Sequence, residues 1–493
     1  MLGRGLRKLL AAGAALAAVL AAVAGATPAP PIATDTFVNV DSQHATLVEP
    51  DTFAYGSTIV AAVQAGRYTD GGSSDLAFAT SIDGGGTWTS GNLPSTTFFS
   101  TPAGPYARLT DPSVAYDAKH ATWLIASLAL DTNVTGVAVA VSASVAGGLT
   151  WGSPIEAATA TGSADFDKSW ITCDNSVSSP FYGRCYVEYD DYGNGNQVHV
   201  AYSDNGSAGG TWTESAMPDR SVIGGQPVVQ PNGTVVMPID DGFEASLLAF
   251  RSVDGGATWT VKKITTIHSH FSDGDIRSGP LPTAEVDGSG RVYVVWADCR
   301  FRKRCTKGDG ANDLVFTTSA NGKSWTKVTR IPIDSTKSGV DHFLPGLAVD
   351  PTTSGSQAAL GVVYYYYPVS ACGGSCQLDV GWVSSTDGGK HWSAPAQLAG
   401  PMSLPWLPDT TEGRMVGDYM SASFVGDAPH PVFVSANQPT GATTDCSLPA
   451  TTCDVALYVA SPPLAARLAS RPAGNDPVLS TSGDRRSGLA SAR

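Results

Sequence analysis

Charged side chains are scarce in this sequence, yet many of them stand together at a few places. Acidic and basic residues make up 15% of the 493 positions, against about 25% in typical globular proteins. Each group directly precedes a run with strand-like alternation. The groups are Arg108 with Asp111, Asp165 with Asp167 and Lys168, Asp273 with Asp275 and Arg277, Asp341 with His342, and Arg414 with Asp418 and Tyr419. Carboxylates held beside cations are the materials of acid–base catalysis and of anion binding.

A second interpretation of these groups is structural. The same side chains could cap strands or hydrogen-bond neighbouring segments, with no ligand involved. The two interpretations differ in geometry, because a catalytic set must converge on one pocket whereas strand caps need not.

Two further motifs carry charge at the end of an expected strand. In YVEYDDY, at 186–192, Glu188 stands with two aspartates. Such a group suits acid–base work or Ca²⁺ binding, or it forms a solvated strand edge. In WADCR, at 296–300, Arg300 follows an aspartate, and the FRKR after it is the most basic part of the chain. That loop could hold an anionic sugar or be merely solvated.

A repeated element positions these groups. The pattern Ser-x-Asp-x-Gly-x-x-Trp occurs in full as SIDGGGTW, SVDGGATW and STDGGKHW, starting at 81, 252 and 385. Degenerate copies, SVAGGLTW, SDNGSAGGTW and SANGKSW, start at 144, 203 and 319. Consecutive copies begin 49 to 67 residues apart, and each follows a segment with the alternation of a β-strand. Six copies at this spacing indicate a repeat architecture.

The repeat unit predicts the fold. Two more strand-like runs lie upstream of most copies, so the unit is a four-stranded antiparallel sheet. We therefore expect an all-β protein, a β-propeller of seven blades, with six blades as the alternative count. Equivalent positions of successive blades converge on the propeller axis, which would bring distant charged groups together.

The repeats resemble the Asp-box (BNR) repeats of sialidase-like β-propellers. The resemblance covers nearly the whole chain after residue 26. It implies that the box aspartates Asp83, Asp254 and Asp387 are structural and lie on the face opposite the active site. A carboxylate in such a turn accepts backbone N–H bonds, and the following glycines supply positive φ.

The resemblance also implies an activity. Sialidases hold a substrate carboxylate with three arginines, use a tyrosine paired with a glutamate as nucleophile, and an aspartate as acid or base. The residues here that match these types are, for substrate binding, Arg108, Lys168, Arg277, Arg300, His342 and Arg414, and for catalysis, Tyr419, Glu188, Asp111, Asp167 and Asp418. The chain departs from sialidases in two respects. Its Arg-Ile-Pro stands at 330–332 rather than near the first strand, and sialidases have six blades.

Two functions therefore stand side by side. One is a secreted exo-glycosidase acting on an acidic sugar, sialic or uronic. The other is a non-catalytic propeller that binds glycan or protein at the cell surface. The net charge of −14 and the lack of a long basic run make nucleic acid an unexpected partner. No cofactor is expected beyond a structural Ca²⁺, and no zinc site.

The termini and the cysteines predict processing and location. Residues 1–26 read as a signal peptide, 27–462 as the propeller and 463–493 as a disordered tail. No stable membrane insertion is expected once the signal peptide is cleaved. The eight cysteines form four close pairs, which we expect to be disulfides of a secreted protein: Cys173 with Cys185, Cys299 with Cys305, Cys372 with Cys376, and Cys446 with Cys453.

Overall fold

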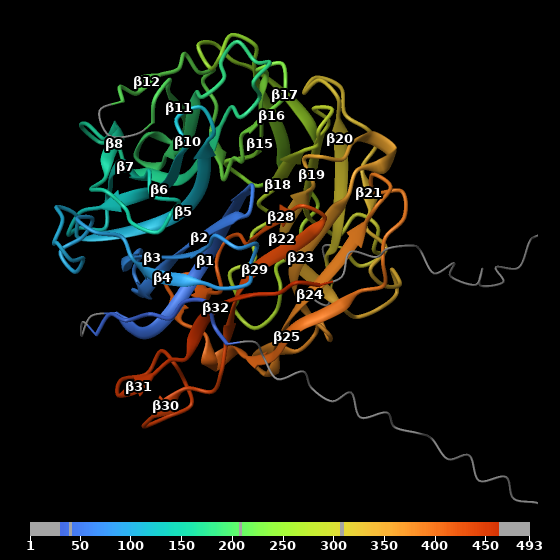
Figure 1. The fold of residues 1–493 in the computed structure, drawn as a ribbon. Helices are drawn as coiled ribbons and strands as arrows, with labels where there is room; N and C mark the ends of the chain where they lie inside the picture. Colours follow the sequence, from blue (N-terminus) through green and yellow to red (C-terminus); the bar gives the residue numbers. More distant parts are fainter. Residues whose placement is uncertain (1–29, 39–41, 207–209, 306–309, 463–493) are drawn as a thin grey trace, which may run out of the picture.

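The computed structural model describes residues 30–38, 42–206, 210–305 and 310–462. The expected signal peptide and tail lie outside these residues. Within them the chain is all-β, and its only helices are four single 3₁₀ turns. No helix in this described part is long and apolar enough to cross a membrane. Groups of consecutive strands follow one another around a ring, as a β-propeller requires (Figure 1).

The first two groups form one eight-stranded sheet. Its strands are β1 (Gln43–Tyr55), β2 (Thr58–Arg67), β3 (Ser73–Ser81), β4 (Thr89–Asn92), β5 (Arg108–Asp117), β6 (Thr122–Leu130), β7 (Gly136–Ser144) and β8 (Ile155–Thr159). Strands β1 to β4 and strands β5 to β8 are two antiparallel meanders. The single pair between Ser73 and Leu109 joins them.

Four further sheets have four or five strands each. The first two contain β9 (Phe166–Cys173), β10 (Cys185–Asp191), β11 (Gln197–Ser203) and β12 (Thr213–Glu214), then β13 (Val222–Ile223), β14 (Val228–Val229), β15 (Val235–Asp241), β16 (Ser246–Ser252) and β17 (Thr260–Thr266). The next two contain β18 (Thr283–Val286), β19 (Val292–Asp298), β20 (Asp313–Ser319) and β21 (Thr329–Arg330), then β22 (Asp341–Val349), β23 (Leu360–Tyr367), β24 (Gln377–Ser385) and β25 (Ala396–Ser403).

The remaining elements are short or complete the ring. They are the three-stranded sheet of β28 (Ser421–Val425), β29 (Ala428–Ala436) and β32 (Val455–Val459), the pairs β26 (Asp409–Thr410) with β27 (Gly413–Arg414) and β30 (Thr440–Gly441) with β31 (Thr451–Thr452), and the turns η1 (Tyr192–Asn194), η2 (Gly355–Gln357), η3 (Gly373–Ser375) and η4 (Leu404–Trp406).

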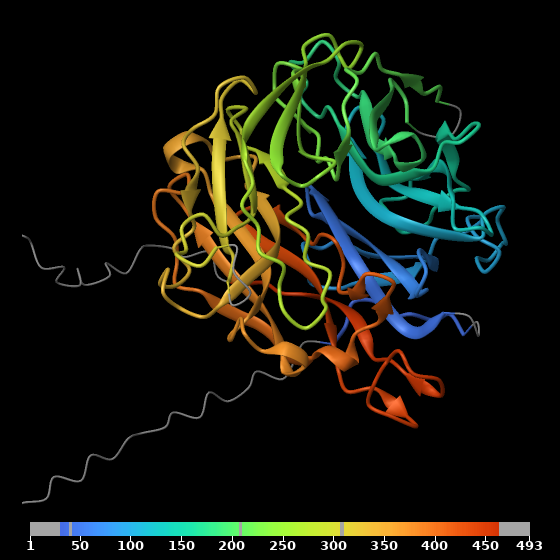
Figure 2. The ribbon, with the colours of Figure 1, turned by 180° about the vertical axis from the view of Figure 1, so that it is seen from behind.

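The ring is closed by its two ends. The backbone N–H of Ile32 donates to Leu457 O at 2.8 Å, and the Leu457 N–H donates to Ala33 O at 3.1 Å. The segment before β1 thus forms the outer edge of the sheet that contains β32. Strands from both ends of the chain lie side by side in the two opposite views (Figures 1 and 2). Closure of this kind leaves only short edges exposed.

The number of blades depends on how the sheets are divided. Five sheets of the described chain have four or more strands. These five differ from the expected seven. A count of seven requires that the eight-stranded sheet be divided at the Ser73–Leu109 pair and that the three-stranded sheet, edged by Ile32 and Ala33, be counted as a blade.

The repeated motif forms the turn predicted for it. In the copy between β16 and β17, Asp254 Oδ1 accepts the backbone N–H of Thr258 at 3.0 Å and the Ser252 hydroxyl at 2.8 Å. Gly255 and Gly256 have φ of 70° and 87°, which glycine adopts without strain. The Trp259 indole donates to Gly256 O at 3.0 Å, and its ring is buried. Asp83 and Asp387 accept bonds in the same pattern.

This turn gives a stability prediction. Replacing Trp259 with alanine should lower the free energy of unfolding by about 3 to 5 kcal/mol, because a large buried aromatic side chain leaves a cavity. Asp254→Ala should cost less, about 1 to 3 kcal/mol for turn bonds left unmade. Urea unfolding of both variants measures the difference. Equal losses for the two variants would contradict the assigned roles of ring and carboxylate.

All four expected disulfides are present. They join Cys173 to Cys185, Cys299 to Cys305, Cys372 to Cys376 and Cys446 to Cys453. Each bond is local, as predicted: the first links the ends of β9 and β10, and the others each close a loop. Four disulfides are typical of proteins that fold in an oxidising compartment.

Candidate functional site

A cavity of about 500 Å³ opens at one end of the central channel. Its walls come from the inner strands β1, β5 and β9, from the loops that follow β2, β6, β10 and β15, and from the segments that precede β18 and β28. Strand β3 begins next to Gly72, which lines the cavity, and ends at Ser81, where the first copy of the repeated Ser-x-Asp-x-Gly-x-x-Trp turn begins. The box turns therefore lie a strand length away, at the other end of the blades.

A repeated backbone irregularity aims charged side chains into this cavity. Glu49, Asp111 and Lys168 have φ of 58°, 49° and 53°, the left-handed region that such residues rarely adopt. Each lies where the register of an inner strand with its neighbour shifts. Such bulges re-aim a side chain, and strained residues of this kind cluster at functional sites. Leu344 on β22 has the same conformation, with φ of 47°, but an apolar side chain.

Asp418 is the centre of the charge network in the cavity. It accepts Lys168 Nζ at 2.5 Å and the Arg277 guanidinium at 2.5 and 3.0 Å. Lys168 Nζ also lies 3.6 Å from Asp111 Oδ1. Burial alone would raise the pKa of Asp418, but the charges of Arg277 and Lys168 outweigh it and hold that pKa below its usual range. Burial opposes the charge of Lys168, yet Asp418 and Asp111 raise its pKa well above the ordinary value.

Two other carboxyl groups of the cavity have a raised pKa instead. Burial, then the nearby charges of Asp111 and Asp418, raise the pKa of Glu49 to about 8. Glu49 accepts the Gln64 amide and, at 3.2 Å, the backbone N–H of Asp418. Burial raises the pKa of Asp167 to about 6, although Lys168 acts in the opposite sense. The cavity therefore holds carboxyl groups whose pKa values are pushed apart, which is typical of acid–base sites.

Five of the residues predicted from sequence meet in this cavity. They are Asp111, Asp167, Lys168, Arg277 and Asp418. Sequence reasoning missed five other charged residues that line it: Glu49, Arg67, Asp70, Glu244 and Glu412. A signal for Glu49 was present, because Glu49-Pro50, Asp111-Pro112 and Leu344-Pro345 occupy the same place in three inner strands. No comparable signal marks Arg67, which ends β2 and bonds Gln64 at 2.9 Å.

The expected nucleophile and its partner are not part of the cavity wall. Tyr419 is buried, and its hydroxyl donates to Pro112 O at 2.8 Å. Burial raises its pKa well above 10.0, so the structure does not support Tyr419 as a nucleophile. Glu188 is fully buried against Gly225, outside the cavity. Burial raises its pKa well above 4.5, and the expectation of a solvated strand edge at Glu188 is wrong.

Four of the expected substrate-binding residues are engaged elsewhere. Arg108 pairs with Asp70 at 2.5 Å, at the rim of the cavity but not in its wall. Arg300 pairs with Asp298 at 2.6 Å. Arg414 binds both oxygens of Asp445 at 2.9 Å. Each arginine is thus held in an ion pair with an aspartate. None of them can bind a ligand in the cavity without breaking that ion pair.

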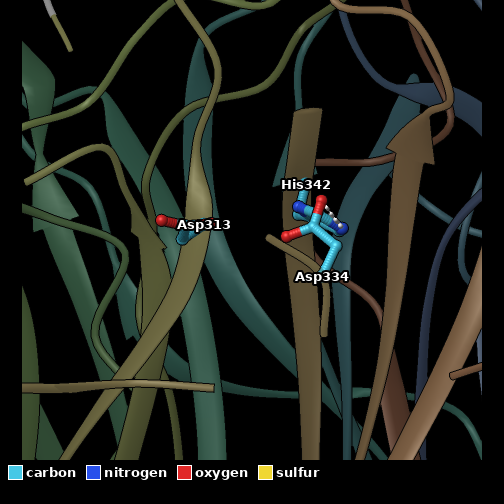
Figure 3. Close-up of side chains that lie close together, drawn as sticks. All are labelled: Asp313, Asp334 and His342. Atoms are coloured by element: carbon cyan, nitrogen blue, oxygen red, sulfur yellow. Dashed lines mark ion pairs between the residues drawn. The ribbon is translucent and has the colours of Figure 1, made fainter. Parts of the chain in front are cut away.

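His342, the fourth of them, belongs to a buried cluster with Asp313 and Asp334 (Figure 3). Ligand atoms of the three lie within 4.8 Å of one another, a spacing that could hold a metal ion. Arg302 already contacts Asp313 at 2.6 Å, and Arg330 contacts the same carboxylate at 2.8 Å. Two guanidinium groups therefore neutralise these acids, and the cluster fits an ion-pair network rather than a cation site. The FRKR loop is not solvated throughout, since Arg302 is buried and pairs with Asp313.

Comparison with known proteins gives only distant similarities. No family model matches the chain, and no curated protein matches it. Among solved structures, a leech intramolecular trans-sialidase has a TM-score of 0.45 at 12% identity, over 67% of this chain and 66% of that one. The intramolecular trans-sialidase of Ruminococcus gnavus has a TM-score of 0.45 at 13% identity, over 69% and 94%.

A protein of unknown function from Dyadobacter fermentans has a TM-score of 0.43 at 18% identity, over 72% of this chain and 98% of that one. The chain spans just under two thirds of the leech enzyme. Similarities of this size do not decide an activity, so the function must be argued from the cavity itself.

Proposed function

We propose that this chain is a secreted glycan-processing enzyme, a glycoside hydrolase on a seven-bladed propeller, whose active site is the cavity at the end of the channel. One observation carries the proposal. Asp111, Asp167 and Asp418 reach the same cavity from three separate parts of the chain, with Lys168 between Asp111 and Asp418. Most glycoside hydrolases use a pair of carboxyl groups, one protonated and one ionised.

The environment of each group supports a separate role. Asp167 is partly exposed to the cavity and is protonated below about pH 6. It donates its proton to the glycosidic oxygen as the bond to the anomeric carbon breaks. Asp111 is the second carboxylate, acting as nucleophile or as base toward water. Its Oδ1 is buried, accepts no hydrogen bond from any described residue and lies 3.6 Å from Lys168 Nζ.

The cations Lys168 and Arg277 hold the carboxylates of the cavity in place through ion pairs. Lys168 and Arg277 stabilise the ionised form of Asp418, and Lys168 also faces Asp111. Glu49, uncharged at neutral pH, lies behind them and bonds Gln64. The bulged backbone at Asp111 and Lys168 fixes the two side chains before substrate arrives. Preorganised charge of this kind is a major source of catalysis.

A non-catalytic binding propeller is the second candidate. Tyr192 and Phe271 line the cavity and are strongly exposed, 66% and 77%. Exposed aromatic side chains around a hollow mark binding surfaces. They suit a glycan binder as well as an enzyme, so turnover must decide between the two.

Release of sugar from glycans tests the proposal. Purified wild-type protein is incubated with a panel of oligosaccharides and glycoproteins, and reducing ends are measured. We expect release from at least one glycan, and none with Asp111→Asn. Reversible glycan binding without release from any member of the panel would favour the binding propeller instead.

The shifted pKa of Asp167 predicts the pH profile. A general acid works only while protonated, so kcat/KM should fall as the pH rises through about 6. Asp167→Asn should remove this limb and lower kcat/KM by about 10²- to 10⁴-fold on natural linkages. An aryl glycoside whose leaving group needs no proton should lose far less. Equal losses on both substrate types would contradict the acid role of Asp167.

A further inference from the structure

We infer that the substrate of this cavity is an oligosaccharide without carboxylate or sulfate groups, whose rings pack on the exposed aromatic side chains of the rim. The inference rests on the proposed function for the location of the site and names its substrate class. It differs from the acidic sugar expected from the sequence. Three independent features of the cavity carry it.

The first feature is the charge of the wall. The lining contains eight carboxyl side chains and three cationic ones. The acids are Glu49, Asp70, Asp111, Asp165, Asp167, Glu244, Glu412 and Asp418, and the cations are Arg67, Lys168 and Arg277. Even with Glu49 and Asp167 protonated, acids outnumber cations. A cavity lined by one sign of charge concentrates the opposite sign and repels its own.

The second feature is that every cation of the wall already has a protein partner. Arg277 donates to Asp418 through Nε and Nη2, and Nη2 also lies 3.4 Å from Glu412. Lys168 Nζ lies between Asp418 and Asp111. A substrate carboxylate recognised by arginine needs the planar fork of a guanidinium. Asp418 occupies the Nε/Nη2 edge of Arg277, so an anionic sugar would have to displace Asp418 from that edge or bind Nη1 while lying next to other carboxylates.

Arg67 does not supply a guanidinium group for an anionic ligand either. Its side chain is 5% exposed, and NH1 donates to Gln64 Oε1 at 2.9 Å. Arg108, just outside the wall, is held by both Asp70 and the Gly71 carbonyl. Each guanidinium in the described wall of the cavity therefore already bonds to another side chain.

The third feature is the aromatic rim. Tyr192 begins the turn η1 after β10, and Phe271 lies in the loop before β18, so two different blades contribute rings to one cavity. Water-exposed aromatic rings are costly unless something covers them. A pyranose ring presents a face of C–H groups that an aromatic ring can cover, while its hydroxyls bond carboxylates. Neutral and amino sugars carry both features and no acidic group.

An oligosaccharide array tests the inference without assuming which sugar is bound. The array contains neutral, amino, uronate, sialylated and sulfated oligosaccharides, and it is read with wild type and with Asp111→Asn, so that cleavage cannot remove a ligand. We expect the bound members to be neutral or amino sugars. Preferential binding of acidic members, or no binding to any member, would overturn the inference.

Variants of the rim provide the matched test. With the strongest array ligand, Tyr192→Ala and Phe271→Ala should each weaken binding by about threefold to tenfold, as loss of a ring contact does. Phe243→Ala is the control, because Phe243 is 87% exposed but does not line the cavity. Unchanged affinity for both rim variants would contradict the aromatic part of the inference.

The two proposals fail in different ways. Binding of neutral glycans without sugar release would leave this inference standing and refute the hydrolase. Release of acidic sugars alone would support the hydrolase and refute the inference.

Discussion

Replacing Asp111 with asparagine should abolish glycan cleavage, with a loss in kcat/KM of about 10³-fold or more, and should leave the melting temperature within a few degrees of wild type. Asparagine has the same shape and tolerates the left-handed backbone conformation at φ 49°. The bulge and the cavity should therefore persist. What is lost is the negative charge that faces Lys168 at 3.6 Å and the oxygen that attacks or activates water.

A matched control variant distinguishes the loss of the Asp111 charge from an effect of the left-handed backbone conformation. Asp275 also has a left-handed conformation, φ 59°, but it is exposed and does not line the cavity. Asp275→Asn should keep full activity. Asp111→Ala is a less suitable variant, because alanine would be strained at this position and could misfold locally. An Asp111→Asn protein that still cleaves glycans at the wild-type rate would remove Asp111 from the mechanism.

The repeat motif was sufficient to predict the all-β propeller. Its Ser, Asp, Gly and Trp bond one another within eight residues, so sequence alone defines the turn, and four close cysteine pairs were similarly local. The blade count was harder to predict. It depends on the ring closure of Ile32 with Leu457, two residues at opposite ends of the chain that no local pattern connects.

The site could be predicted only in part, for a geometric reason. The search for charged residues just before inner strands identified Asp111, Asp167 and Lys168. It succeeded because equivalent positions of successive blades all lie near the propeller axis. It failed for Arg414, whose pair with Asp445 is specific to its loop. Arg300, which was chosen at the end of an expected strand, likewise pairs with Asp298 in its own loop. Sequence cannot show which arginines are already paired, and that property decides the charge of the ligand.

Buried carboxyl groups outside the active cavity predict that this protein is more stable in mild acid than at alkaline pH. Burial raises the pKa of Asp75 and of Glu285 to about 8 and that of Asp51 to about 7. The cavity residue Glu49 behaves in the same way, with a pKa of about 8. In the unfolded chain all four titrate near 4.

Between pH 5 and pH 8 the unfolded chain has therefore lost protons that the folded protein keeps, so the free energy of unfolding falls as the pH rises. Since one pKa unit corresponds to about 1.4 kcal/mol, each group that stays protonated in the folded state lowers the free energy of unfolding by about 1.4 kcal/mol per pH unit over this interval, which urea unfolding measures. Asp75→Asn should flatten the slope, because an uncharged amide can still accept the Thr96 hydroxyl and Leu76 N–H bonds at 2.7 and 2.8 Å. Asp83→Asn should leave the slope unchanged, because the pKa of Asp83 is already lowered to about 2 by the bonds it accepts from Thr87. A protein that gains stability from pH 5 to pH 8 would show that these carboxyl groups are ionised in the folded state, with partners that the burial argument leaves out.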